Sequence, residues 1–387
     1  MPSDWHSKSL GDLLALQRGF DLPSQDRRSG PIPIMGSAGI TGFHDKATTK
    51  GPGVVIGRSG VGSMGVTSFI DRDFWALNTT LFVTDFKGND ARFIYYLLSS
   101  INFRHLDSGS AQASLNRNLV YPVRVVVPPT LDEQKRIAGF LATVESRIDL
   151  LRQTNATLES IAQALFKSWF IDFDPVRAKA EGREPLGLDA ATAALFPAEF
   201  EESALGVIPK GWTAGSVGDL LMLQRGFDLP AAQRTDGPFT VFAASGPHGS
   251  HHEAMVSGPG VTTGRSGVIG RVFFSHEDFW PLNTSLWVKE FKRATPAYAF
   301  QYLQTMDLKR LNAGSAVPTL NRNHVHAQPA IVPPAGLVER YTDMAMSLLH
   351  RVRVNDQHAQ RLSELRDTLL PRLISGKLRL PEAQAMM

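Results

Sequence analysis

Three short motifs that combine amide, guanidinium and hydroxyl side chains each occur twice in the chain. They are QRGF (17–20 and 224–227), GRSG (57–60 and 264–267) and LNRN (115–118 and 320–323). Glutamine can pair with two atoms of adenine and arginine with two atoms of guanine, and hydroxyl and amide groups bind phosphate oxygens. The motifs therefore predict contacts with the bases and the backbone of a nucleic acid.

The QRGF motif places an amide and a guanidinium side by side before a glycine. The residues that we expect to contact bases are Gln17, Arg18, Gln224 and Arg225. One good bidentate pair gives roughly 1–3 kcal/mol of discrimination against the wrong base. The alternative is that each arginine forms a salt bridge with the aspartate three residues later and organises the loop. The sequence leaves both interpretations open.

The GRSG and LNRN motifs predict phosphate contacts. Glycines let a loop approach a phosphate backbone closely, and the arginine supplies the charge. The candidate residues in GRSG are Arg58, Ser59, Arg265 and Ser266, and those in LNRN and the loop before it are Ser110, Asn116, Arg117, Ser315, Asn321 and Arg322. The alternatives are a tight turn with a solvated arginine for GRSG and turn-capping asparagines for LNRN.

Histidines mark a segment in which two otherwise similar copies differ, 41–45 against 248–252. His44 and His251 occupy matching positions, and we add both, with His248, to the candidate DNA contacts. Differences on an expected loop are where two binding sites would acquire different preferences. A metal site of the three histidines of the second copy is an alternative that we do not favour, because the first copy keeps only one of them.

These motifs belong to a duplicated globular unit. Residues 11–23 and 218–230 lie 207 positions apart and differ at a single position, whereas the later motifs lie 205 positions apart, which indicates a two-residue deletion between GRSG and the following DFW segment. Each copy has the turn-bounded apolar runs of short strands, at 31–35, 53–56, 66–70 and 80–84 in the first, and one short helix, at 90–99 and 296–305. We predict two tandem α+β domains.

The aromatic residues of the DFW segments are expected to be core positions. Phe74, Trp75, Phe279 and Trp280 begin strands with hydrophobic alternation. That pattern favours burial over a role in stacking on bases.

Each domain is followed by a heptad pattern of apolar residues. In the first it comprises Ile137, Leu141, Val144, Ile148, Leu151, Asn155, Leu158, Ala162, Leu165 and Trp169, and in the second Ala345, Leu348, Val352, Asn355, Ala359, Leu362, Arg366, Leu369 and Leu373. The spacing predicts coiled-coil helices of roughly 35 residues. Asn155 and Asn355 would fix the register. The alternative is two helices that pack only on their own domains.

The predicted organisation has five parts. They are a first domain (1–130), a central coiled-coil helix (131–173), a linker with at most one helical turn (174–208), a second domain (209–335) and a C-terminal coiled-coil helix (336–380). The linker is predicted from its content of Ala, Glu, Pro and Gly.

Composition excludes several classes of protein. The 387 residues include 40 Lys and Arg against 37 Asp and Glu, so the chain is not a polycation and its net charge alone says little about nucleic acid. No cysteine is present, which excludes disulfides and cysteine-ligated metals and suits a cytosolic protein. No apolar run approaches the ~20 residues of a membrane span, and no signal peptide is apparent. We expect a soluble, cytoplasmic protein.

Motifs for covalent chemistry are missing. The sequence has no GxxxxGK[ST] phosphate loop and no Asn-Pro-Pro-aromatic or Asp-Pro-Pro-aromatic motif of an amino-methyltransferase. The segment GVGSMG at 60–65 fits GxGxxG, but the second copy breaks the spacing and a strand is expected to follow. An NAD-linked enzyme is therefore not favoured, and we predict no catalytic residue, no bound cofactor and no metal.

Three segments carry a resemblance to a known family. PPTLDEQKRIAGFL (128–141) opens the first long helix, LFKSWFIDFDPV (165–176) closes it, and LLPRLISGKL (369–378) closes the second. With two variable α+β domains, this arrangement resembles the specificity subunit of type I restriction-modification systems. The resemblance implies two target-recognition domains in a pseudo-twofold repeat, each followed by a long helix, with the two helices forming an antiparallel coiled coil.

The resemblance also implies a function and partners. The chain would be a noncatalytic subunit that binds double-stranded DNA at a bipartite site with a nonspecific spacer. Two methyltransferase subunits would supply S-adenosylmethionine and adenine methylation, and motor-nuclease subunits, where present, would supply cleavage. The alternative from another class is a coiled-coil scaffold or adaptor whose two domains bind protein or glycan.

Overall fold

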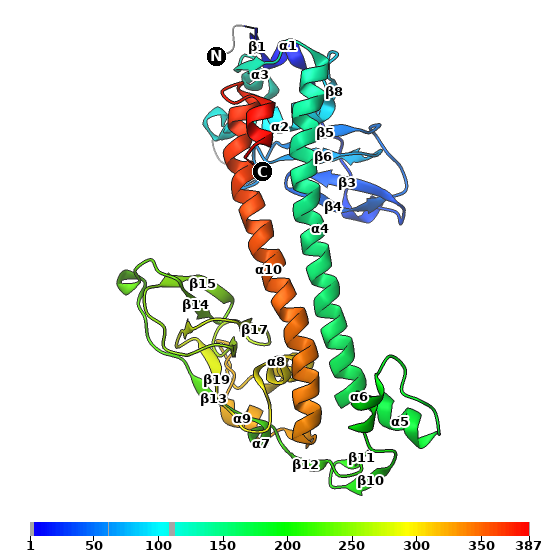
Figure 1. The fold of residues 1–387 in the computed structure, drawn as a ribbon. Coiled ribbons are helices and arrows are strands. Elements are labelled where there is room, and N and C mark those ends of the chain that lie inside the picture. Colours follow the sequence, from blue (N-terminus) through cyan, green and yellow to red (C-terminus); the bar gives the residue numbers. More distant parts are fainter. Residues whose placement is uncertain (1–3, 61, 108–112, 387) are drawn as a thin grey trace. The chain divides into compact units, whose positions relative to one another are not determined.

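The computed structural model describes residues 4–60, 62–107 and 113–386 (Figure 1). The chain forms two compact units, one of Met1–Leu151 with Gln357–Met387 and the other of Arg152–Asp356. Each unit contains one copy of the repeat and a part of each of two long helices. Within the described residues no helix combines the length and the apolar character that a membrane span requires.

The domain of the first unit is built on two small sheets. A four-stranded antiparallel sheet has the order β2-β8-β5-β6, a three-stranded sheet has the order β4-β3-β7, and β1 pairs with β9. The strands are β1 (His6–Ser9), β2 (Ala15–Arg18), β3 (Ile32–Gly36), β4 (Gly39–His44), β5 (Gly53–Gly57), β6 (Thr67–Ile70), β7 (Trp75–Ala76), β8 (Thr80–Asp85) and β9 (Arg124–Val127). β5 is buried along its whole length, as its run of Val and Ile requires.

Short helices cover this domain. They are α1 (Leu10–Leu13), α2 (Ala91–Ser99) and α3 (Arg117–Val120), with the 3₁₀ turns η1 (Ser24–Asp26) and η2 (Phe103–Leu106). Asp90 caps α2 by accepting the N–H of Phe93 at 2.8 Å. The apolar face of α2 buries Phe93, Ile94 and Leu97 in the domain core. The predicted strands and the predicted helix are confirmed.

The domain of the second unit repeats the same topology. Its sheets have the orders β13-β19-β16-β17 and β15-β14-β18, and β12 pairs with β20. The elements are β12 (Thr213–Ser216), α7 (Val217–Leu220), β13 (Leu221–Arg225), η3 (Ala231–Gln233), β14 (Phe239–Ala243), β15 (Gly246–His251), β16 (Gly260–Gly264), β17 (Val272–Ser275), β18 (Phe279–Pro281), β19 (Ser285–Phe291), α8 (Pro296–Thr305), η4 (Leu308–Leu311), α9 (Arg322–His326) and β20 (Pro329–Val332). The α+β repeat is confirmed strand by strand.

Three of the four DFW aromatic residues are core positions, as predicted, whereas Trp75 is only partly buried. Phe74 and Phe279 are fully buried and Trp280 is 8% exposed. Gly53 and Gly260 pack against the two phenylalanine rings, where a Cβ atom would lie 2.3 and 2.4 Å from ring carbons. The ring therefore fixes the residue type on the neighbouring strand.

The segment predicted as a linker with at most one helical turn is more ordered than that. It forms α5 (Asp174–Ala180), α6 (Ala190–Ala194) and a hairpin of β10 (Phe200–Ser203) and β11 (Gly206–Pro209). Val176 and Phe196 are buried in the core of the second unit with Trp212. The prediction failed because these elements are too short to show a hydrophobic period, while their few apolar residues suffice to anchor them.

Two helices of 40 residues follow the domains, α4 (Leu131–Phe170) and α10 (Ala335–Ile374). In the first unit, Ile137 near the start of α4 shares a core with Leu373 near the end of α10, and Leu151 packs with Ala359. In the second unit, the hydroxyl of Tyr341 donates to the carbonyl of Ala162 at 3.1 Å. In both units the helices therefore pack antiparallel, and they exceed the predicted length by about one turn.

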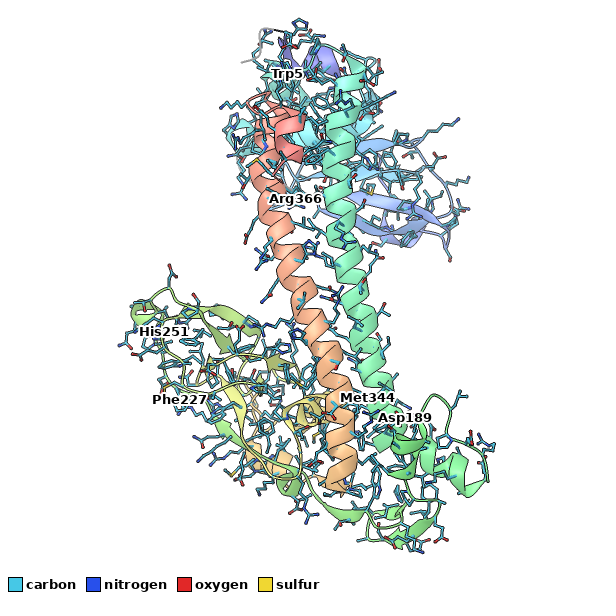
Figure 2. The ribbon with its side chains drawn as sticks, in the orientation of Figure 1. Trp5, Asp189, Phe227, His251, Met344 and Arg366 are labelled. Carbon is cyan, nitrogen blue, oxygen red and sulfur yellow. The ribbon has the colours of Figure 1, made fainter. Side chains whose placement is uncertain are left out.

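Arg366 is the charged residue of the α10 heptad pattern (Figure 2). Its guanidinium lies 4.0 Å from the carboxylate of Glu145 on α4 and also pairs with Asp367. The side chain remains 28% exposed. Arginine is tolerated at this seam because it keeps part of its charge in water and finds acidic partners.

The two seam asparagines contact each other in the second unit. Asn155 Nδ2 donates to the carbonyl of Val352 at 3.1 Å and to Asp356 Oδ1 at 2.7 Å. Asn355 Nδ2 donates to Asn155 Oδ1 at 2.9 Å. Both side chains are buried, so each amide depends on the other helix for its partners.

Replacing one asparagine should destabilise the helix pair more than replacing both. Asn155→Leu leaves the buried Asn355 amide without its acceptor, at a cost of about 1–3 kcal/mol, whereas Asn155→Leu with Asn355→Leu removes donor and acceptor together. Urea unfolding of the chain with both single variants and the double variant measures this. A double variant that loses the sum of the two single losses would contradict it.

Candidate nucleic-acid interface

The three motifs of the first domain meet at one cleft. A cleft of about 580 Å³ is lined by Gln17, Arg18, Arg58, Leu81, Ser114, Leu115, Asn116 and Arg117. Three of these residues are arginines and none is a carboxylate. The cleft therefore attracts anions, and its amide groups add hydrogen-bonding capacity that fits either phosphate oxygens or base edges.

Close backbone contacts bring the motifs together. The N–H of Leu115 donates to the carbonyl of Arg58 at 2.8 Å, and the N–H of Phe20 donates to that of Ala76 at 2.8 Å. A Cβ atom on Gly19 would lie 2.1 Å from the carbonyl oxygen of Leu77. The glycine of QRGF is therefore required for the chain to pass over the loop at 76–79.

Arg18 and Arg58 both reach this loop. Arg58 Nη1 donates to the carbonyl of Asn78 at 3.2 Å, so part of its guanidinium is used inside the domain. Arg18 lies 3.7 Å from Asp21, and its side chain is 55% exposed. The salt bridge considered for Arg18 exists, but an exposed pair contributes little and can exchange partners. Arg18 Nε also donates to the carbonyl of Asn78 at 3.4 Å, and a ligand in the cleft would compete with both contacts.

The LNRN residues have structural roles as well. Asn116 caps α3, because its side-chain oxygen accepts the N–H of Asn118 at 2.9 Å. Arg117 Nη1 donates to the carbonyl of Leu16 at 3.2 Å. The capping alternative is thus observed, and the amide nitrogen of Asn116 still provides a donor on an exposed side chain. Ser59 forms an isolated antiparallel β-bridge with Ser114, next to the hydrogen bond between Leu115 and Arg58. Ser110 lies outside the described residues.

The second domain repeats the contacts. Leu320 N–H donates to the carbonyl of Arg265 at 2.8 Å, and Arg265 Nε donates to that of Asn283 at 2.8 Å. A Cβ atom on Gly226 would lie 2.3 Å from the carbonyl oxygen of Leu282, as one on Gly19 would lie 2.1 Å from that of Leu77. The arrangement is therefore a property of both copies.

The remaining candidates of the second domain lie around this contact. Gln224 is half-buried on β13, and Arg225 lies 3.4 Å from Asp228 with a 52% exposed side chain. Asn321 caps α9 through the N–H of Asn323 at 2.9 Å. Ser266 bridges to Thr319, and Ser315 and Arg322 are exposed.

Two of the three histidine predictions do not hold. His44 and His251 are each 3% exposed, and their Nδ1 atoms accept the backbone N–H groups of Arg28 at 3.0 Å and Thr235 at 3.3 Å. Each ring also stands edge-on to a tryptophan at 5.2 Å. We therefore assign both rings to the interior and not to DNA contact. His248 is exposed on β15.

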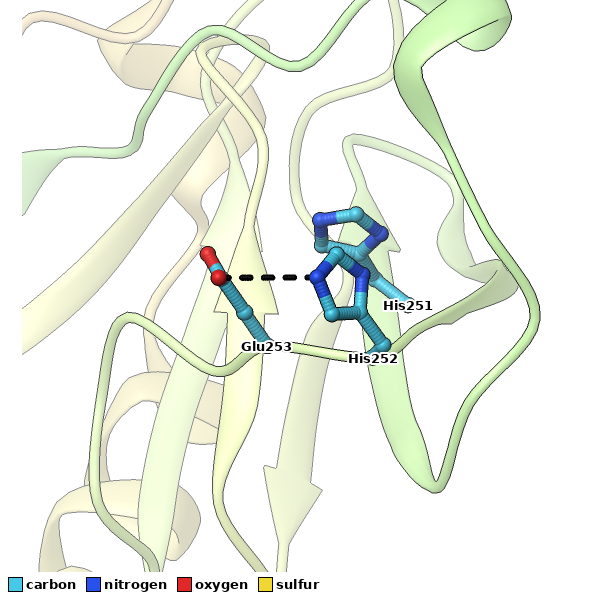
Figure 3. A group of neighbouring side chains, drawn as sticks. All are labelled: His251, His252 and Glu253. Atoms are coloured by element: carbon cyan, nitrogen blue, oxygen red, sulfur yellow. Dashed lines mark ion pairs between the residues drawn. The ribbon is translucent and has the colours of Figure 1, made fainter.

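His251, His252 and Glu253 form the group whose ligand atoms lie within 4.8 Å of one another (Figure 3). Because His251 Nδ1 accepts a backbone N–H, the neutral ring carries its proton on Nε2 and keeps no lone pair for a metal ion. The first domain has Lys46 in place of Glu253. The geometry favours a structural role for this group.

The segments 41–45 and 248–252, predicted as a loop, lie mainly in strands. They belong to β4 and β15, each an outer strand of a three-stranded sheet. In the first domain Ile40 and Phe43 are each 50% exposed, whereas the second presents His248. The two domains therefore expose different side chains at equivalent outer strands; β15 is labelled in Figure 1.

The LNT loop was missed as part of the site. The carbonyl of Thr79 accepts the N–H groups of Arg58 and Ser59, and the side chain of Asn78 donates to Asp21. In the second domain Thr284 and Asn283 make the same contacts. The repetition of LNT in both copies was the available signal, but its place beside buried aromatic residues indicated only core.

Comparison with protein families agrees with this geometry. The model of the type I restriction modification DNA specificity domain matches residues 2–160 and 209–339, which is more than half of the chain. The chain belongs to this family. Each matched segment contains one domain with the contacts described above, and the first also includes part of α4.

Individual relatives are distant but span the chain. The HindI type I restriction enzyme specificity subunit of Haemophilus influenzae is 25% identical and covers 97% of this chain and all of its own length. The MjaIX specificity subunit of Methanocaldococcus jannaschii is 22% identical over 76% of this chain and 71% of its own. The crystal structure of the S subunit from M. genitalium superposes with a TM-score of 0.67 at 17% identity, covering 96% of both chains, which shows a shared fold.

Gly19→Ala should destabilise the first domain. The new Cβ atom meets a backbone oxygen that cannot move aside, which predicts a loss of about 1–3 kcal/mol in the free energy of unfolding. Gly139→Ala on α4 is the control, because a Cβ atom there meets nothing within 4 Å and helix propensity predicts a small gain. Thermal unfolding compares the two, and equal stability of both variants would show that the close contact is not required.

Proposed function

We propose that this specificity subunit reads a bipartite site in double-stranded DNA, one half with each domain. The observation that carries the proposal is the repeated meeting of QRGF, GRSG and LNRN, which forms an arginine- and amide-lined cleft in the first domain. Exposed arginines with exchangeable partners suit contact with base edges, and the capped, glycine-bounded loops suit contact with phosphates. We retain as candidates the polar residues of the three motifs together with Ser110, Ser315 and His248. The buried His44 and His251 are left out.

The long helices would separate the two half-sites. Each unit contains an antiparallel contact between α4 and α10, with a seam of buried apolar residues. Packed helices keep their length, so the pair suits a spacer of fixed extent between two recognition domains. The number of base pairs between the half-sites would then be fixed, and their sequence would not be recognised.

The chemistry would come from other subunits. The chain lacks a phosphate loop and the proline motifs of amino-methyltransferases, which supports a noncatalytic role without a bound cofactor. Two methyltransferase subunits would bring S-adenosylmethionine and methylate adenine, and motor-nuclease subunits would cleave unmodified DNA in the cytoplasm. The scaffold alternative has no observation that favours it over DNA binding.

Sequencing of modified bases tests the proposal directly. Deleting the gene for this chain should remove adenine methylation from one bipartite motif and leave all other modified motifs unchanged. Because the two domains share the three motifs, we expect the half-sites to be related, one in inverted orientation. A strain whose methylated motifs are unaffected by the deletion would refute DNA specificity for this chain.

Arg18→Ala and Arg225→Ala should each relax discrimination at one half-site only. Loss of a bidentate base contact lowers discrimination by roughly 1–3 kcal/mol at that half. Binding of the assembled complex to duplexes with substitutions in either half measures this. Arg28→Ala removes the same charge from the first domain outside the cleft and is the control. Equal weakening on all sequences would make the two arginines phosphate contacts.

A further inference from the structure

The strand that carries the candidate base contacts is an edge strand in both domains. β2 and β13 each lie at the end of a four-stranded sheet, so one side of the strand has no neighbouring strand to bond its backbone. The pairing register also shifts at this point, between Ala15 and Leu16 and between Met222 and Leu223. Such irregularities change the direction of the side chains that follow, which here are those of the QR pair.

In each domain a side chain at the end of the short helix that begins in LNRN, α3 or α9, forms a hydrogen bond with the backbone of this edge strand. In the first, the hydroxyl of Tyr121 accepts the N–H of Leu16 at 2.9 Å and donates to its carbonyl at 3.2 Å. In the second, His326 Nε2 accepts the N–H of Leu223 at 2.8 Å. Tyr121 and His326 lie at equivalent positions of the repeat, directly after α3 and at the end of α9. The contact is the same, but the chemical group differs.

The two groups respond differently to pH. The imidazole can accept an N–H only while its Nε2 is unprotonated, whereas a tyrosine hydroxyl keeps its acceptor throughout the range in which imidazole titrates. Burial, followed by the charges of Arg322 and Lys292, lowers the pKa of His326 below its ordinary value. The other elements packed against α9 contribute the charged residues Asp219, Arg225, Lys309 and Arg310.

We propose that His326 is a positioning residue of the second domain, which holds Gln224 and Arg225 in place while neutral and releases them when protonated. The inference rests on the proposed function, since it concerns recognition of the second half-site. Recognition of that half-site is therefore sensitive to pH, and recognition of the first, where Tyr121 makes the contact, is not.

The sign of the effect follows from the lowered pKa. Above the ordinary pKa of histidine, both the folded and the unfolded chain hold a neutral ring, and the contact is fully present. As the pH falls below about 6.5, the unfolded chain takes up the proton first, so the folded arrangement loses stability. When the folded ring is protonated as well, the N–H of Leu223 loses its acceptor.

The test measures base discrimination by the complex of the full chain with its methyltransferase subunits. Affinities for the cognate duplex and for duplexes substituted in one half-site are compared at constant ionic strength as the pH is lowered stepwise from about 8. Discrimination at the second half-site should fall roughly tenfold over the range in which the folded ring takes up its proton, the effect of one lost hydrogen bond with a donor left unsatisfied. Discrimination at the first half-site should change less than about twofold.

Three variants connect the effect to this ring. His326→Gln and His326→Tyr keep an acceptor that does not titrate and should remove the pH dependence. Tyr121→His should confer it on the first half-site. All the variants retain His248 and His324, so a difference between their pH profiles and that of the wild-type complex comes from the substituted position.

The outcomes separate the two proposals. A wild-type complex that discriminates at about pH 8 but whose pH profile is unchanged by His326→Gln and His326→Tyr overturns the role of His326 and leaves DNA reading intact. A complex that shows no half-site discrimination at any pH overturns both. If His326→Gln loses discrimination at every pH because its amide does not reach the N–H of Leu223, His326→Tyr alone decides: a wild-type pH profile in His326→Tyr would overturn the pH-dependent role.

Discussion

The candidate interface depends on a backbone contact that only glycine permits. Gly19 and Gly226 place the QRGF chain directly on the carbonyl groups of the LNT loop, with no room for a Cβ atom. That loop in turn receives the backbone of GRSG through Thr79 and Thr284. Arg58 and Arg265 then bond the asparagine carbonyls. The candidate residues of QRGF and GRSG are therefore positioned relative to one short turn, whose Asn and Thr residues are half-buried in both domains.

The same contact explains why a nearly neutral chain can offer a site for a polyanion. A net charge of +3 spread over 387 residues creates no strong overall field. The cleft of the first domain nonetheless gathers three arginines that are far apart in the sequence and has no carboxylate in its lining. Hydrogen bonds to backbone carbonyls hold these arginines close together. The positive charge is therefore concentrated at the cleft although the total charge of the chain is low.

The sequence predicted those parts of the structure that are repeated or periodic. Duplication identified both domains, and the heptad spacing identified both helices and placed Asn155 and Asn355 in the seam, where the structure shows them in contact. It misplaced His44 and His251, because a buried histidine that accepts a backbone N–H looks in sequence like an exposed polar residue. It also missed the order of the segment at 174–208, where Phe196 and Val176 anchor elements too short to have a period.

Equivalent positions that differ between the copies separate into two kinds. Residues on the outer strands β4 and β15 are exposed, so changing Ile40 or Phe43 alters the surface without disturbing the glycine contact. Tyr121 and His326, each in its own domain, bond the backbone of the edge strand that carries the Gln-Arg residues and do not face a ligand. A substitution on β4 or β15 changes which side chains are exposed. A substitution at Tyr121 or His326 changes how firmly the Gln and Arg residues of QRGF are held. Two domains with the same motifs can therefore differ both in preference and in the conditions under which that preference is expressed.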